Sequence, residues 1–123
     1  MKFISFEKDE NLLFGVIEND FIYDLYAINS NIAESMLEFM QGGNEQLDLA
    51  HKAIQENEPS MNVNDVKLLS PITNPPSVRD AYAFRQHVAT ARRNRGLEMI
   101  PEFDEIPIFY FTNHNAVFGP GNF

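Results

Sequence analysis

The densest group of chemically active side chains lies between residues 79 and 87. A carboxylate, a phenol, a guanidinium, an amide and an imidazole occur within the eight residues from Asp80 to His87. Aspartate is a hard oxygen ligand suited to Mg²⁺, Mn²⁺ or Ca²⁺. Histidine is the side chain best able to exchange a proton near neutral pH. If the segment is helical throughout, Asp80, Phe84 and His87 share one face. The residue types alone favour a plainer interpretation, an amphipathic helix whose N-terminus Asp80 stabilises.

The elements around this group follow a proline-rich stretch over residues 70–77, which is the best linker candidate because its prolines forbid a helix. Ser77 could then cap a helix from Val78 to about Arg95, which Gly96 would end. The second part of the chain is further expected to contain an irregular acidic loop over 97–105, a strand over 106–111, a turn over 113–115 and a strand over 116–118.

The N-terminal part predicts a small α+β domain. Short apolar runs over 2–7, 12–18 and 21–26 predict a three-stranded meander, with a hairpin turn at Asn19-Asp20. Ser35 is a candidate cap for a helix that stops at Gly42-Gly43, and Asn44 is a candidate cap for a second helix. Residues 63–69 suggest another strand.

The distribution of charge also divides the chain near residue 70, at the proline-rich linker candidate. The net charge is −9, and residues 1–70 contain 13 of the 18 acidic residues together with all four lysines, whereas residues 71–123 contain five acidic residues and five arginines. The break predicts two units, with boundaries 1–70 and 71–123. An acidic chain is poorly suited to binding nucleic acid. We expect no membrane-spanning segment and no signal peptide, and the lack of cysteine is compatible with a cytoplasmic protein.

Three groups of residues carry a resemblance to a known family. Asn74-Pro75-Pro76-Ser77 precedes the spaced run that ends at Gln86-His87, and Phe109-Tyr110-Phe111-Thr112-Asn113 and Phe118-Gly119-Pro120-Gly121 follow. Together they closely resemble the entry to the catalytic domain of the fumarylacetoacetate hydrolase family. The N-terminal part, including residues 35–40, resembles the small leading domain of bacterial members.

This resemblance implies a metal-dependent hydrolase that cleaves carbon–carbon bonds in acylpyruvates or other 1,3-dicarbonyl keto acids, with isomerase and decarboxylase relatives. It matches Asp80 to a metal-ligand carboxylate and His87 to the general base that activates water. Tyr82 matches a substrate-contacting residue, and Arg92 or Arg95 could pair with a substrate carboxylate. The intact enzyme would need a divalent cation (Mg²⁺, Mn²⁺ or Ca²⁺) and would form a homodimer. The fold expected is α+β, with the first strands of an incomplete, mainly-β catalytic domain after the helix.

The family's remaining ligands, a Glu-x-Glu pair and a later aspartate, have no counterpart after Asp80 in this sequence. We therefore expect the chain to be the N-terminal portion of such an enzyme, inactive alone and without a stably bound cation. Two alternatives stay open: a non-catalytic acidic binding or assembly module, or one half of a split enzyme. His51 and His114 are interpreted as a surface residue and a turn residue. Residues 71–123 are expected to be partly disordered or paired with another copy.

Overall fold

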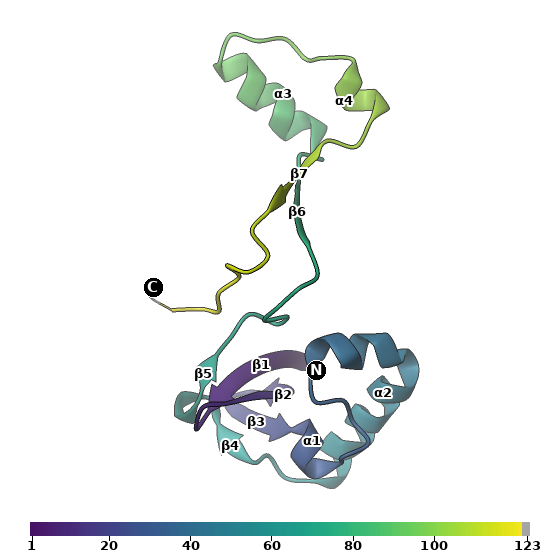
Figure 1. Cartoon of the computed structure of the whole chain (residues 1–123), viewed down its shortest axis with the longest axis vertical. Coiled ribbons are helices and arrows are strands. Elements are labelled where there is room, and N and C mark those ends of the chain that lie inside the picture. The colour runs from purple at the N-terminus through teal and green to yellow at the C-terminus, as the bar shows by residue number, and fades with distance from the viewer. Residues whose placement is uncertain (122–123) are drawn as a thin grey trace. The chain divides into compact units, whose positions relative to one another are not determined.

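The predicted three-stranded meander is confirmed, and it forms the centre of a five-stranded sheet (Figure 1). The computed structural model describes residues 1–121. Asn19, in the predicted hairpin turn, has a φ of 54°, a left-handed conformation that asparagine tolerates better than most residues. All neighbouring strands in the sheet order β4-β3-β2-β1-β5 are antiparallel. The strands are β1 (Lys2–Lys8), β2 (Asn11–Glu18), β3 (Phe21–Asp24), β4 (Met61–Asn62) and β5 (Lys67–Leu68).

Side chains cap the helices that follow the meander. Asp24 ends β3 earlier than predicted, because its carboxylate accepts a hydrogen bond from the N–H of Ala27 and starts α1 (Leu25–Ile28). The predicted cap Ser35 accepts from the N–H of Glu38, the first-turn acid of α2 (Met36–Glu56). The predicted break within this helical segment is present at Gly43, whose φ is 60° and ψ is −138°.

The core lies between the sheet and α2. Strand alternation places Phe3, Phe14 and Val16 on one face, and the rings of Phe3, Phe14 and Phe39 lie with centroids 4.7–5.9 Å apart. Burying one such side chain contributes roughly 2–3 kcal/mol. The buried core residues are Phe14, Val16, Leu25, Ile32, Phe39, Ala50 and Ala53.

The described chain forms two compact units. The first, called the N-terminal unit, contains residues 1–75 and 116–121, with a 3₁₀ helix η1 (Val63–Asp65) between β4 and β5. The second, called the hairpin unit, contains Pro76–Asn115. Residues 116–121 therefore pack with the first unit and not with the second. This differs from the expected boundaries of 1–70 and 71–123. Residues 122–123 lie outside the described residues. The elements of the hairpin unit are β6 (Val78–Ala81), α3 (Arg85–Asn94), α4 (Glu102–Glu105) and β7 (Phe109–Thr112).

The predicted helix starts later than the sequence suggested. Residues 78–81 form a strand because they pair with β7, and the helix begins only at Arg85. The grouping of Asp80 with Phe84 and His87 on one helical face is therefore wrong. Gly96 does follow the end of the helix, with a φ of 73°.

Four other predicted elements differ from the structure. The strand expected over 106–111 is β7, which begins only at Phe109 and ends at Thr112. Residues 97–105 include the short helix α4 and are not entirely irregular. The strand expected over 63–69 is reduced to β5, because η1 occupies its first part. Residues 116–118 are not a strand, since they have no paired neighbour in the described part of the chain.

The fold class is α+β, as predicted. No helix within residues 1–121 is both long enough and apolar enough to cross a membrane.

Candidate functional site

The predicted metal ligand, Asp80, lies on β6. This strand pairs with β7 in an antiparallel pair that is closed by a long connection carrying α3 and α4 and is called the hairpin. The register pairs Asp80 with Tyr110 and Arg79 with Phe111, so the two pairs lie on opposite faces of the hairpin. On the Asp80 face, the Tyr110 hydroxyl donates a hydrogen bond of 2.6 Å to Asp80 Oδ2. On the other face, the Arg79 guanidinium lies 4.9 Å from the Phe111 ring centroid and 5.7 Å from that of Phe109. The hairpin thus fixes one carboxylate beside a phenol.

The hydrogen bond to Asp80, followed by the negative charge of that carboxylate, raises the pKa of Tyr110 above its ordinary value of 10.0. The raised pKa means that the protonated phenol stabilises the folded state. This contribution is present below the unfolded-state pKa and is lost as the pH rises through the folded-state pKa.

Replacing Asp80 with asparagine should lower the pKa of Tyr110, because the charged acceptor is removed. Ultraviolet titration of the tyrosines should show one of the four phenols ionising earlier in Asp80→Asn than in the parent chain. Asp104→Asn is the matched control, since Asp104 pairs with Arg85 and contacts no tyrosine hydroxyl through a hydrogen bond. An unchanged titration curve for Asp80→Asn would contradict the contact.

A short turn after β6 leads into α3, which carries the predicted base, His87, near Asp80. The Tyr82 N–H donates to the Ile108 carbonyl at 3.0 Å, which extends the hairpin by one residue. Helix α3 then starts after Phe84, whose side chain is 81% exposed, and Val88 anchors the helix as a buried residue. The Tyr82 ring meets the His87 ring edge to face, with centroids 6.4 Å apart. The His87 imidazole is exposed, so it is accessible to water.

Four of the five predicted site residues line one open pocket of about 860 Å³ in the hairpin unit. Asp80 comes from β6, and Tyr82 comes from the turn that follows it. His87 lies in α3, and Arg95 is the residue directly after this helix. The remaining lining residues are Ala81, Ala83, Phe84, Ile108, Phe109 and Tyr110. The pocket therefore combines a carboxylate, two phenols, an imidazole and a guanidinium with an apolar wall.

Arg92, the fifth predicted site residue, does not line this pocket. Its Nε donates a hydrogen bond to the Glu98 carbonyl and so holds the loop after α3. Arg95 uses its Nε for the Ala91 carbonyl at 3.1 Å. No carboxylate pairs with Arg95 among the described ion pairs, so its charge stays available to an anion. Of the two arginines matched to a substrate carboxylate, the geometry favours Arg95.

A bidentate ion pair closes the loop that carries α4. Arg85 Nε and Nη2 donate to the two carboxylate oxygens of Asp104 at 2.8 and 3.1 Å. This interaction lowers the pKa of Asp104, chiefly through the hydrogen bond from Arg85. Asp104 thereby holds α4 against the start of α3.

The described residues do not form a cation site by themselves. Mg²⁺, Mn²⁺ and Ca²⁺ take six or more oxygen ligands, and Asp80 is the one carboxylate among the residues lining the pocket. Across residues 1–121, no three His, Asp or Glu side chains gather closely enough to hold a metal ion. A cation bound at Asp80 would take its other ligands from water, from a substrate or from a further polypeptide segment.

The hairpin unit leaves much apolar surface uncovered. Val88 is its buried hydrophobic residue, whereas Phe84, Tyr110 and Phe111 are each more than 60% exposed. Both strands of the hairpin also have an unpaired edge in the described structure. Exposed apolar patches and open strand edges favour association with another chain.

We therefore expect the 123-residue chain to self-associate in a concentration-dependent way through the exposed aromatic residues and open strand edges of the hairpin unit. Phe111→Ser should reduce the association, because it removes an aromatic side chain that is 66% exposed. Phe21→Ser, at a residue that is 50% exposed in β3, should not reduce it. Sedimentation velocity over a range of concentrations provides the measurement. A chain that stays monomeric at all concentrations would contradict the expectation.

Comparison of the chain with protein-family models and with curated proteins finds no match.

Proposed function

We propose that this chain is the N-terminal part of a metal-dependent hydrolase of the fumarylacetoacetate hydrolase type. Residues 1–70 would be the small leading domain and residues 71–123, of which 71–75 and 116–121 pack with the N-terminal unit, would be the beginning of the catalytic domain. The substrate would be an acylpyruvate or a related 1,3-dicarbonyl acid, and the reaction cleavage of a carbon–carbon bond. A cytoplasmic location and a homodimeric state belong to the same proposal.

One observation carries this proposal. The resemblance points to Asp80, Tyr82, His87 and Arg95, and all four line the same pocket, although the helical face predicted to group Asp80 with His87 is not formed. Closeness in the sequence accounts for part of this grouping, and pairing of β6 with β7 adds Phe109 and Tyr110 from about 30 residues away. The pocket offers a base, an anion-binding group and an apolar wall, which suit the binding of a keto acid and the activation of water, whereas the divalent cation would stabilise the enolate leaving group.

The roles of this chain's own side chains follow from their chemistry. The exposed His87 imidazole would accept a proton from water, and the adjacent Tyr82 ring would limit its orientations. The Arg95 guanidinium would pair with the substrate carboxylate. Since the described residues do not fit a divalent cation alone, the missing carboxylates would come from a further segment.

The first test is the source gene downstream of the codon for Phe123. The proposal expects an open frame that encodes a Glu-x-Glu pair, and the longer product should hydrolyse acylpyruvates in the presence of Mg²⁺ or Mn²⁺. If the frame stops at Phe123, a neighbouring frame should encode that part and restore activity when both chains are mixed. If neither frame exists, or neither preparation hydrolyses acylpyruvates, the proposal is wrong.

A non-catalytic binding or assembly module is the second candidate. The exposed aromatic residues of the hairpin unit and the single carboxylate in its pocket favour it. A monodisperse chain that unfolds cooperatively and shows no Mn²⁺ binding by calorimetry, with no complementing frame, would support this candidate.

A further inference from the structure

A second pocket lies in the N-terminal unit, where the sheet face that packs on α2 continues past the core. Strand register places Leu12, Glu7 and Lys67 side by side across β2, β1 and β5. Leu69 follows in the next row on the same face, since its N–H donates to the Ser5 carbonyl at 2.9 Å. Leu12 is 55% exposed, so this end of the apolar face is not covered by the helix.

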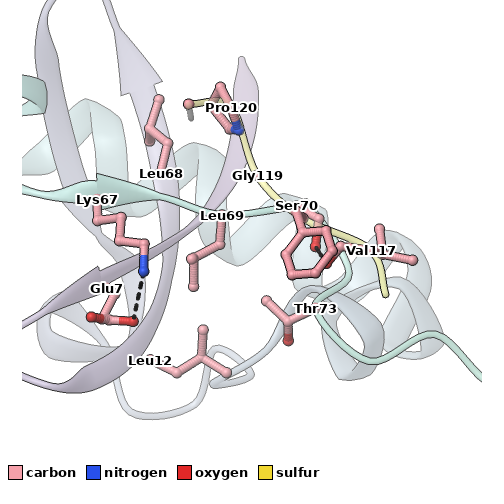
Figure 2. A pocket seen from close by; sticks show the side chains of 12 residues that line it. Glu7, Leu12, Lys67, Leu68, Leu69, Ser70, Thr73, Val117, Gly119 and Pro120 are labelled. Atoms are coloured by element: carbon pink, nitrogen blue, oxygen red, sulfur yellow. Dashed lines mark hydrogen bonds and ion pairs between the residues drawn. The ribbon is translucent and has the colours of Figure 1, made fainter. Parts of the chain in front are cut away.

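Residues 117–121 form the wall of this pocket, which has a volume of about 710 Å³ (Figure 2). Ser70, which is only 5% exposed, directs its hydroxyl to the Val117 carbonyl at 3.4 Å and the Ile72 carbonyl at 3.2 Å. A Cβ atom at Gly119 would lie 2.5 Å from the Leu68 carbonyl oxygen. The segment therefore crosses the β5 edge at a distance that only glycine permits.

The lining is mainly apolar and carries one pair of opposite charges. Leu12, Leu69 and Val117 supply apolar surface, and Thr73 adds a hydroxyl. Lys67 Nζ lies 3.8 Å from Glu7 Oε2, which is longer than a hydrogen bond, so both groups stay available to a ligand (Figure 2). A volume between about 300 and 1,000 Å³ with few polar groups is typical of small-molecule sites.

We propose that this pocket binds a small uncharged molecule with an apolar body and one hydroxyl or carbonyl group. The body would pack on Leu12 and Leu69, and the polar group would reach the Glu7–Lys67 pair or Thr73. An uncharged ligand fits best because the charges of Glu7 and Lys67 in the lining cancel. The N-terminal unit as a whole contains 13 acidic residues and four lysines, so it repels anions. This proposal concerns a site separate from Asp80 and His87 and does not depend on the proposed function.

The test is a titration of the ¹⁵N-labelled 123-residue chain with 1-octanol, followed by amide chemical shifts. We expect saturable changes confined to residues near Leu12, 67–70 and 117–120. Octanoate, which has the same chain length and a negative charge, should bind several-fold more weakly at low salt. Shifts centred on α2, shifts that do not saturate, or octanoate binding as tightly as octanol would overturn the proposal.

Two variants and one control locate the site. Leu12→Asp should weaken octanol binding by about tenfold or more, because it places a charge against the apolar body; tenfold corresponds to about 1.4 kcal/mol. Leu97→Asp, at a similarly exposed leucine of the hairpin unit, should leave the affinity unchanged. Gly119→Ala should abolish binding by displacing the wall while the amide shifts of β2 and β3 are preserved. Equal effects of the two leucine variants would show non-specific binding and overturn the proposal.

Discussion

Gly15→Ala is expected to unfold the N-terminal unit or to destabilise it by about 3 kcal/mol or more, the upper part of the range for forced overpacking. Gly15 is a buried residue in the middle of β2, where it pairs with Ile4 on one side and Asp24 on the other. A Cβ atom at this position would lie closer than 3.0 Å to the Tyr23 carbonyl oxygen and 3.3 Å from the Phe6 ring. The first contact is with backbone, so relieving it requires β2 and β3 to separate.

Circular dichroism during urea unfolding measures this effect. The matched control is Gly96→Ala, where no atom lies within 4 Å of the added Cβ and only the positive φ of 73° opposes alanine. Gly96→Ala should lower the free energy of unfolding by about 1–2 kcal/mol, and this loss should affect the hairpin unit. If Gly15→Ala unfolds at the same urea concentration as the parent chain, the tight approach of β2 to β3 is wrong.

The N-terminal unit could be predicted well from the sequence because its signals are local. The turn at Asn19-Asp20, the cap at Ser35 and the break at Gly43 each depend on residues within a few positions of one another. The closure of the sheet by β4 and β5 could not be predicted in this way. Those strands are two residues long, and their partners lie about 40 or 60 positions away in the sequence.

The hairpin unit shows what local patterns miss. Val78–Ala81 is compatible with a helix, yet it forms a strand because β7 offers a partner about 30 residues later. The same pairing brings Tyr110 to Asp80, a contact that no spacing in the sequence indicates. Asp80 and His87 still line one pocket, because the turn after β6 places the start of α3 beside the strand. The predicted residues therefore lie near one another, whereas the helical face proposed to group Asp80 with His87 was wrong.

The largest functional effect is expected from His87→Ala in the complete enzyme that the proposal requires. General-base catalysis contributes about 10²–10⁴-fold to the rate, so kcat on an acylpyruvate should fall by at least about 100-fold. The KM should change little, because a residue that acts on the attacking water contributes mainly to the transition state. Progress curves at several substrate concentrations would separate the two constants.

His51→Ala is the matched control for His87→Ala. His51 is an exposed histidine on α2 in the N-terminal unit, and it lines none of the pockets described above. Its replacement should leave kcat and KM unchanged, so that a loss seen only in His87→Ala cannot result from removing a surface imidazole. Arg95→Ala should instead raise KM, since the guanidinium would bind the substrate carboxylate in both the ground state and the transition state. If His87→Ala retains full kcat, His87 is not the base, and the pocket must be assigned to binding without catalysis.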